Sequence, residues 1–202
     1  MPQAIDYFYS HVSPWAFFGH PRFLSLAQRR GVLINFHPIT VAEVFPKTGG
    51  LPLAKRPPER RAYRMVELKR WSKYLDMPIN FEPKFFPVND RPSLQFSLAA
   101  AQAGADLGSL SYALMKAVWQ QDRDVSDWST LAEIGTEAGL NGDALVAEAQ
   151  TDAIKAKGVA ESELALQAGC FGVPWYSYKG EGFWGQDRLE LLEHALEHHA
   201  SA

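Results

Sequence analysis

The sequence predicts an α/β fold in which a mostly helical segment interrupts two strand-forming parts of one chain. The first forty residues hold two β-branched or aromatic segments separated by a helix-forming stretch. Residues 92–168 are rich in Ala and Leu and are broken by glycines, as in a set of helices. After residue 170 the chain returns to strand-like segments around a glycine turn. We therefore expect one domain from residues 1–40 and 170–202, and a mostly helical inserted domain from residues 41–169.

Composition sets the outer limits of the function. The chain has 202 residues, of which 47% are hydrophobic and 12% aromatic, so it can bury a core and is not of a disordered class. No apolar run reaches the roughly 20 residues that a membrane span needs, and no signal-peptide pattern opens the chain. Cys170 is the only cysteine, which excludes an internal disulfide and a cysteine-rich zinc site. We expect no metal site and a cytoplasmic location.

The charge is unevenly distributed along the chain. The net charge is −3, which argues against general affinity for nucleic acid. Residues 47–91 nevertheless hold eleven Lys or Arg against five acids, so this segment is +6 and the remainder is −9. Two interpretations stay open: a solvated helix face, or contacts with a small anionic ligand.

The first strand and helix have clear start and stop signals. Residues 5–9 are β-branched or aromatic except for Asp6 and are typical of a short strand, and Ser13 then offers a side-chain oxygen at the N-cap position. Residues 14–30 keep helical spacing, begin with a proline and end before a glycine. Pro21 lies inside this span, so we expect a kink or short break after Gly19.

Helices and loops fill the middle of the chain. Residues 32–39 read as a second strand and residues 45–58 as a loop rich in Gly and Pro. Four prolines in residues 77–92 exclude a regular helix there. A β-hairpin around residues 176–184 and a final amphipathic helix close the chain. The predicted middle helices cover residues 59–75, 92–103, 109–121, 127–139 and 142–168, the last interrupted near Thr151.

Two distant segments carry the candidate chemistry. The Ser13 hydroxyl stands at a helix N-terminus, which suits an anion. The Phe-Gly-Val-Pro sequence at 171–174 precedes the third strand. The element order resembles that of the thioredoxin fold, in which such a proline follows a cis peptide and faces the N-terminus of the first helix. On the residues alone, a plain N-cap at Ser13 and a simple turn at Val173–Pro174 stay open.

Three motifs together identify a family resemblance. They are Ser13-Pro14, Phe171-Gly-Val-Pro174 and Trp184-Gly-Gln-Asp-Arg188, and their order and separation extend over almost the whole chain. The chain resembles the 2-hydroxychromene-2-carboxylate isomerases, which are related to kappa-class glutathione transferases and belong to the DsbA-like thioredoxin superfamily. The resemblance implies a thioredoxin-like fold with an all-helical insertion between strand 2 and strand 3. It also implies a homodimer.

The resemblance further implies a reaction and a cofactor. The reaction is the interconversion of 2-hydroxychromene-2-carboxylate and trans-o-hydroxybenzylidenepyruvate, by reversible addition of the glutathione thiolate to an aromatic keto-acid or chromene substrate. The tetrad Ser13-Pro-Trp-Ala16 has neither thiol of a disulfide oxidoreductase, so dithiol–disulfide exchange at this position is excluded. Ser13 is the implied catalytic residue. The implied glutathione contacts are Ser13, Lys47, Phe85, Val173, Pro174, Trp184, Gly185, Gln186 and Asp187.

Each implied role has a simpler alternative. The backbone of Val173 would pair with the glutathione cysteine as an added strand. Asp187 would pair with the γ-glutamyl ammonium, or act only as an N-cap. Lys47 would meet a carboxylate, or be an ordinary exposed loop lysine. Two positions depart from the family pattern: Gln186 replaces a common Asn, and Phe85 replaces a frequent Tyr.

Three neighbouring residues complete the predictions. His11 and Trp15 flank Ser13, and we expect His11 to line the substrate cavity and Trp15 to join the core. Cys170 is expected to be an inert buried thiol. Two other functions stay open: a kappa-like glutathione transferase acting on electrophiles, and a non-catalytic thioredoxin-fold module that binds peptides through Val173–Pro174.

Overall fold

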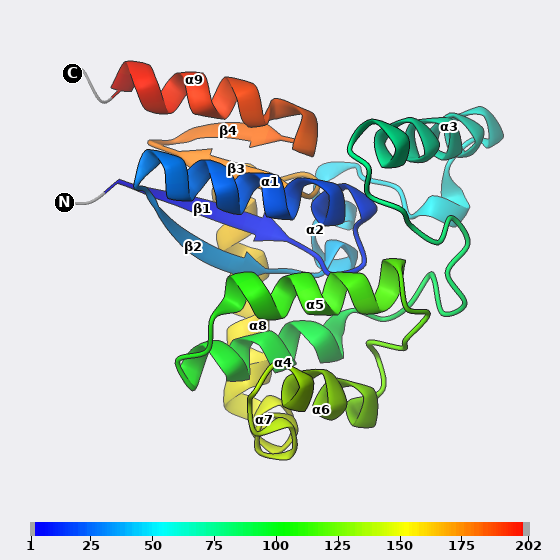
Figure 1. Cartoon of the computed structure of the whole chain (residues 1–202), viewed down its shortest axis with the longest axis vertical. Helices are drawn as coiled ribbons and strands as arrows, with labels where there is room; N and C mark the ends of the chain where they lie inside the picture. The colour runs from blue at the N-terminus through cyan, green and yellow to red at the C-terminus, as the bar shows by residue number, and fades with distance from the viewer. Residues whose placement is uncertain (1–2, 200–202) are drawn as a thin grey trace.

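The structure, a computed structural model, describes residues 3–199, with the side chain of His199 left out. It contains one four-stranded sheet and helices on both faces, joined in the predicted order (Figure 1). The elements are β1 Ala4–Tyr9, α1 Pro14–Arg30, β2 Leu33–Pro38, α2 Val41–Thr48, η1 Leu53–Lys55, α3 Pro58–Tyr74, α4 Arg91–Gln102, α5 Leu107–Trp119, α6 Trp128–Glu137, α7 Gly142–Ala149, α8 Asp152–Gln167, β3 Trp175–Tyr178, β4 Glu181–Trp184, η2 Gln186–Arg188 and α9 Leu189–His199.

The sheet joins the two ends of the sequence. Its strand order is β2-β1-β3-β4, with β1 parallel to β2 and antiparallel to β3, and β3 antiparallel to β4. Phe8 of β1 lies opposite His37 on one side and Trp175 on the other. This pairing places β3 against β1, so the segment just before β3 lies close to the segment that follows β1. The thioredoxin-like fold is confirmed.

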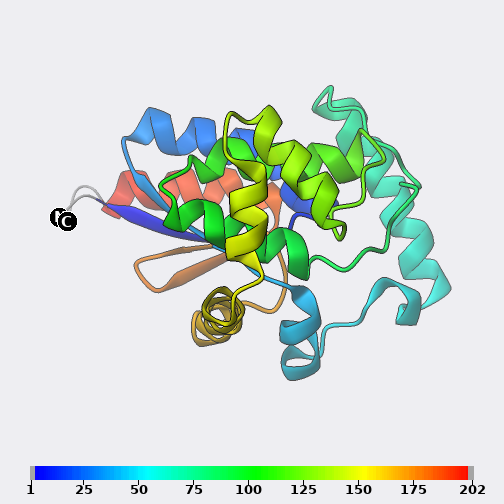
Figure 2. The same ribbon diagram turned by 90° about the horizontal axis from the view of Figure 1, so that it is seen from below.

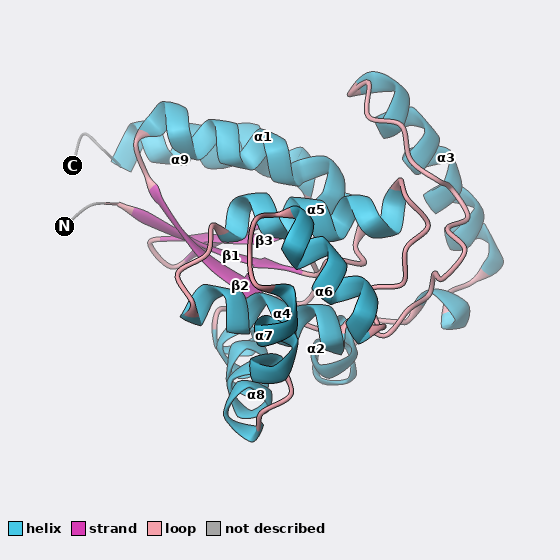
Figure 3. Cartoon of the chain, turned by 60° about the horizontal axis from the view of Figure 1, so that its bottom comes forward, coloured by secondary structure: helices cyan, strands magenta, loops and turns pink. Residues whose placement is uncertain are grey.

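Alternate residues of β1 build the two halves of the core. Ile5, Tyr7 and Tyr9 are fully buried in the larger cluster, together with residues of α1, α5 and α9. Phe8 points to the other face, into a smaller cluster that includes Val44 of α2 and Ala165 of α8. Figure 3 shows α1 and α9 on one side of the strands and α2 and α8 on the other. Both faces of the sheet are therefore covered by helices.

Helix α1 has the predicted ends and no break. Ser13 accepts a hydrogen bond from the Ala16 N–H at 3.2 Å, and Gly31 ends the helix with φ +62°. The helix continues through Pro21, so a break after Gly19 is wrong, while a kink there stays a prediction. Proline removes one backbone hydrogen bond, but the aromatic residues on both sides of it are fully buried, and this packing holds the helix together.

The region predicted as a loop after β2 begins with a helix. Residues 41–48 form α2, although Pro46 lies inside it. Thr40 caps this helix by accepting from the Ala42 N–H at 3.4 Å, and Val44 is fully buried. Capping and burial outweigh the Gly and Pro signals that predicted a loop. Residues 77–90 are confirmed as free of regular helix, whereas residues 91 and 92 already belong to the first turn of α4.

The division into two domains stays a prediction. Helices α2 to α8 do lie between β2 and β3 in the sequence, but the larger core cluster joins residues of the sheet with residues of α4 to α7. In Figure 2, β1 begins and α9 ends at one end of the molecule, while α3 lies at the other. Figure 1 shows that the carboxyl end of β1 and the start of α1 point toward α2 and α3. Among the described residues, none of the helices is long and apolar enough to cross a membrane.

Candidate functional site

Ser13 lies between β1 and α1, close to the segment before β3. The residue is 9% exposed, and its hydroxyl oxygen accepts a hydrogen bond from the Ala16 N–H. The hydroxyl proton is directed to the Val173 carbonyl oxygen at 3.5 Å, at the limit of a hydrogen bond. A bond this long is weak, so the hydroxyl can turn toward an anion, where the hydrogen bond is charge-assisted and stronger.

The Val173–Pro174 peptide bond is cis, as predicted, and this segment faces Ser13. Within residues 3–199, the Val173 N–H has no hydrogen-bond partner, and neither has the Trp15 N–H at the start of α1. A backbone N–H group without a hydrogen-bond partner is available to bind a ligand. The site therefore offers one hydroxyl and two backbone N–H groups from two segments that are 160 residues apart.

The Trp184–Asp187 segment adjoins the same place. The Gly185 N–H donates to the Pro174 carbonyl oxygen at 2.9 Å, and Gly185 has φ +102°. Trp184 is 51% exposed and packs edge-on against Phe171, with ring centroids 4.7 Å apart. Asp187 is exposed, and among residues 3–199 its ion-pair partner is its neighbour Arg188. Such an exposed ion pair is weak, so the carboxylate can exchange it for another cation.

The side chain of Gln186 points away from solvent. The residue is 2% exposed, and its side-chain and backbone oxygens both accept hydrogen bonds from the Arg22 guanidinium. The close packing of η2 on α1 explains this, since a Cβ on Gly19 would come within 2.8 Å of the Gln186 Cβ. A ligand contact from Gln186 would therefore have to use its backbone.

Lys47 lies on a helix next to the site, and Phe85 lies in the segment between α3 and α4. Lys47 is in the last turn of α2 and not in the predicted loop. One turn earlier, Val44 packs in the same cluster as Val173, which puts α2 next to the site. Phe85 contacts the ammonium of Lys84, with 5.1 Å from Nζ to the ring centroid. The described contacts do not join Phe85 to Ser13, and both ligand roles stay predictions.

Sequence reasoning gave His11 a different place. The residue is 1% exposed, and its ring nitrogens share hydrogen bonds with Ser93 and Ser97 of α4 at 3.1 and 3.2 Å. Burial lowers the pKa of His11 to about 3, with a smaller contribution from His20, so the ring is neutral. His11 ties the β1–α1 turn to α4 and does not line a substrate cavity. Trp15 packs against the core, as predicted.

A buried carboxylate below the site escaped the sequence analysis. Asp90 is 6% exposed and accepts from the Ser10 hydroxyl at 2.6 Å. Burial raises the pKa of Asp90, although the neighbouring Ser10 and Thr40 hydroxyls act in the opposite direction. Because Ser10 and Asp90 are 80 residues apart, sequence spacing gives no signal of their contact.

The positive segment contains a cation without an acidic partner. Arg64 of α3 is partly buried, with its guanidinium 5.5 Å from the centre of the Phe86 ring. Among the described residues it has no carboxylate within ion-pair distance. Burial, together with the nearby charge of Arg56, lowers the pKa of Arg64 to about 10. An anion bound at this end of the molecule would offset that repulsion.

Cys170 is a buried thiol, as predicted. It is fully buried, and burial raises the pKa of Cys170 to about 11, which favours an inert thiol. The thiolate is the reactive form of cysteine, so this residue does not replace the thiols missing from the Ser13 tetrad. Nucleophilic sulfur chemistry at this site therefore needs a thiol from another molecule.

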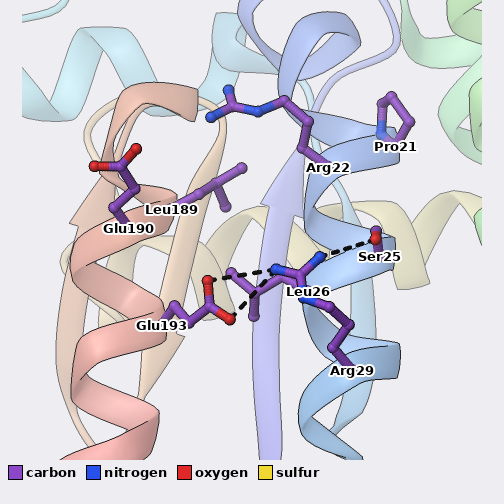
Figure 4. Close-up of a pocket in the computed structure, with 8 residues that line it drawn as sticks. All are labelled: Pro21, Arg22, Ser25, Leu26, Arg29, Leu189, Glu190 and Glu193. Carbon is purple, nitrogen blue, oxygen red and sulfur yellow. Dashed lines mark hydrogen bonds and ion pairs between the residues drawn. The ribbon is translucent and has the colours of Figure 1, made fainter.

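Two hollows on the surface lie away from Ser13. The groove between α1 and α9 has a volume of about 420 Å³ and includes the Arg29–Glu193 ion pair (Figure 4). A second hollow of about 570 Å³ borders β2 and the start of α5. Neither is lined by a predicted site residue. The candidate site is therefore an arrangement of polar groups at the carboxyl end of β1, a usual ligand position in α/β folds.

Similarity to known proteins extends over nearly the whole chain. The profile of the DSBA-like thioredoxin domain family matches residues 4–197. A 2-hydroxychromene-2-carboxylate isomerase of Sphingobium xenophagum is 26% identical over 197 residues, which are 97% of this chain and 99% of that protein. Glutathione S-transferase kappa 1 of Caenorhabditis elegans is 22% identical over 205 residues, 96% of this chain and 90% of that protein.

Solved structures of other proteins have a similar fold. A 2-hydroxychromene-2-carboxylate isomerase superimposes with a TM-score of 0.80 at 22% identity, covering 98% of this chain and 96% of its own. The cytosolic disulfide reductase DsbM of Pseudomonas aeruginosa, in a structure with GSH, gives 0.70 at 16% identity, covering 98% of this chain and 100% of its own. The family profile matches nearly the whole chain, whose fold and strand order are described above. The chain therefore belongs to the DSBA-like thioredoxin domain family.

Proposed function

We propose that this protein is a glutathione-dependent isomerase that interconverts 2-hydroxychromene-2-carboxylate and trans-o-hydroxybenzylidenepyruvate. The observation that carries the proposal is Ser13: a hydroxyl at a helix N-terminus, beside a cis-proline segment, with no thiol of its own. The isomerases of this name that are similar to the chain over nearly its full length supply the reaction.

The residues present fit glutathione. Its thiolate would accept a hydrogen bond from the Ser13 hydroxyl. It would face the positive end of α1, where the Trp15 N–H has no hydrogen-bond partner among the described residues. The unpartnered Val173 N–H and the Val173 carbonyl suit strand-like pairing with a peptide backbone. Gly185, Gln186 and Asp187 border the position for a γ-glutamyl group. A kappa-class transferase and a GSH-containing DsbM structure among the relatives support the same ligand.

When bound, glutathione supplies a thiolate that adds to the substrate and leaves again after a bond rotation, so there is no net redox change. Ser13 lowers the free energy of the thiolate by donating its hydroxyl proton in a hydrogen bond. Lys47 of α2 provides positive charge for a glutathione carboxylate. Arg64 of α3, which has no carboxylate within ion-pair distance among the described residues, provides positive charge for the substrate carboxylate. The protein thus contributes positioning and charge stabilisation.

The test is turnover of 2-hydroxychromene-2-carboxylate, followed by its absorbance change. We expect isomerisation with glutathione and none with S-methylglutathione, which has the same peptide but no free thiol. Equal rates with both, or no turnover at millimolar glutathione, would overturn the proposal. Cytoplasmic location and a homodimer belong to the same proposal; light scattering of the purified protein measures the second.

The similarity to a kappa-class transferase supports a second candidate, conjugation of electrophiles at the same Ser13 site. Glutathione consumption separates the two. An isomerase regenerates glutathione, so its free thiol concentration stays constant during turnover. A transferase lowers the thiol concentration in step with the product formed.

A further inference from the structure

We propose that Asp90 is the positioning residue of this site, holding the Ser10–Ser13 turn in the arrangement that presents the Ser13 hydroxyl. The inference rests on the proposed function and names the group on which its geometry depends. Asp90 acts through Ser10 and is not itself a catalytic residue.

Asp90 occupies a helix N-cap without capping the helix. It precedes α4, where an aspartate side chain usually accepts from backbone N–H groups of the first turn. Here the side chain makes no such bond and turns toward β1 and β2 instead, while the Ser93 hydroxyl and the Leu94 N–H donate to the Asp90 backbone oxygen, both at 3.0 Å. The carboxylate is therefore committed to contacts outside its own helix.

The contact with Ser10 controls the turn that carries Ser13. The Ser10 hydroxyl donates to Asp90 at 2.6 Å, and the same oxygen accepts from the Val12 N–H at 3.3 Å. The Ser10 carbonyl oxygen accepts from the Ser13 N–H at 3.1 Å. Ser10 therefore holds the N–H groups of Val12 and Ser13, and Asp90 sets the direction of the Ser10 hydroxyl.

The start of α2 lies beside the same carboxylate. The Thr40 side chain is a neighbour of Asp90, and its oxygen accepts from the Ala42 N–H as the N-cap of α2. Helix α2 carries Lys47 and packs Val44 against the cluster that contains Val173. The Asp90 carboxylate therefore binds Ser10 after β1 and lies near the residue that follows β2, the parallel neighbour of β1.

The charge of the Asp90 carboxylate sets the strength of this contact. The neighbouring Arg91 is paired with Glu43 at 2.6 Å and not with Asp90, so the Ser10 hydroxyl is the donor that holds the buried carboxylate. Leaving a carboxylate in such a place is costly. A hydrogen bond to a carboxylate is charge-assisted and roughly twice as strong as one between neutral groups. Asn at this position would offer Ser10 a neutral acceptor and weaken the hydrogen bond.

The test compares Asp90→Asn and Ser10→Ala with a matched control, Asp106→Asn. Asp106 is the exposed N-cap aspartate of α5, and its side chain accepts from the Gly108 N–H at 2.9 Å. The first measurement is amide hydrogen exchange without any ligand. We expect exchange about tenfold faster at Val12 and Ser13 in both test variants, and unchanged in the control.

The second measurement is turnover with glutathione. We expect a lower kcat with a smaller change in KM for the two test variants, since the hydroxyl is misplaced while the peptide contacts remain. Should Asp90→Asn fail to fold, Ser10→Ala still breaks the link and leaves Thr40 in place. Exchange and kcat that match the control in the folded variants would overturn the proposal. Absence of glutathione binding by the wild type would instead overturn the proposed function, and hydrogen exchange would still decide the role of Asp90.

Discussion

Replacing Ser13 with glycine removes the hydroxyl that should stabilise a bound thiolate, while keeping a residue type that tolerates the N-cap position. In the structure the Ser13 oxygen accepts from the Ala16 N–H at 3.2 Å, and its proton is held by only a 3.5 Å contact with the Val173 carbonyl. A hydrogen bond to a charged group contributes about 1.5–3 kcal/mol. Since one pKa unit corresponds to about 1.4 kcal/mol, the thiol pKa of bound glutathione should rise by about 1–2 units.

The assay is a pH titration of the thiolate absorbance of glutathione in the presence of wild-type or Ser13→Gly protein. Turnover at neutral pH should fall by roughly 10- to 100-fold with the thiolate population. Thr151→Gly is the matched control, because Thr151 caps α8 through the Ile154 N–H at 3.4 Å and lies outside the predicted site. It reports the effect of losing an N-cap alone, a few tenths of a kcal/mol in stability.

One result would refute the reasoning about Ser13. If Ser13→Gly binds glutathione with the wild-type thiol pKa and turns over substrate at the wild-type rate, the hydroxyl does not stabilise the thiolate. A loss of activity matched by Thr151→Gly would show that helix capping, and not thiolate stabilisation, is what the substitution disturbs.

Three further predictions concern other parts of the molecule. Burial opposes the charge of His37, but its 2.6 Å hydrogen bond to Glu161 outweighs burial and raises the pKa of His37. The stabilisation of the folded state is therefore present below the ordinary histidine pKa and is lost as the pH rises through the raised pKa of His37. The Tm advantage of wild type over Glu161→Gln should therefore shrink from about pH 6 to about pH 8, and a constant difference would contradict this. Cys170 should resist thiol reagents at neutral pH until denaturant is added, because burial raises its pKa to about 11; rapid labelling of the native protein would show the thiol to be accessible. Gly185→Ala should lower the free energy of unfolding by about 1–3 kcal/mol in urea, since φ is +102° and the new Cβ would lie 2.5 Å from Asp187 Oδ1; unchanged stability would mean that the turn relaxes.

The parts of the fold that sequence could predict depend on local signals. Ser13 with the following proline, and Gly31, mark both ends of α1 because capping acts within one turn. Leu192 and Leu196 mark the buried face of α9 by helical spacing. Helix α2 was missed because the burial of Val44 against the sheet, a tertiary contact, outweighs the proline inside it.

The site could be predicted only in part for the same reason. The meeting of Ser13 with Val173 follows from the fold family, since the order of elements fixes which strand ends are adjacent. The contact between Ser10 and Asp90 depends on how α4 packs below the sheet, and nothing in the spacing of the two residues indicates it. His11 was placed in a cavity because sequence cannot show that two serines of α4 satisfy its ring.

A crystal structure of the protein with glutathione tests the central claim most directly. We predict the glutathione sulfur within hydrogen-bond distance of the Ser13 hydroxyl oxygen, with the tripeptide backbone paired to Val173. Glutathione bound elsewhere in an active crystal, for example in the groove between α1 and α9, with Ser13 still directed at the Val173 carbonyl, would contradict it.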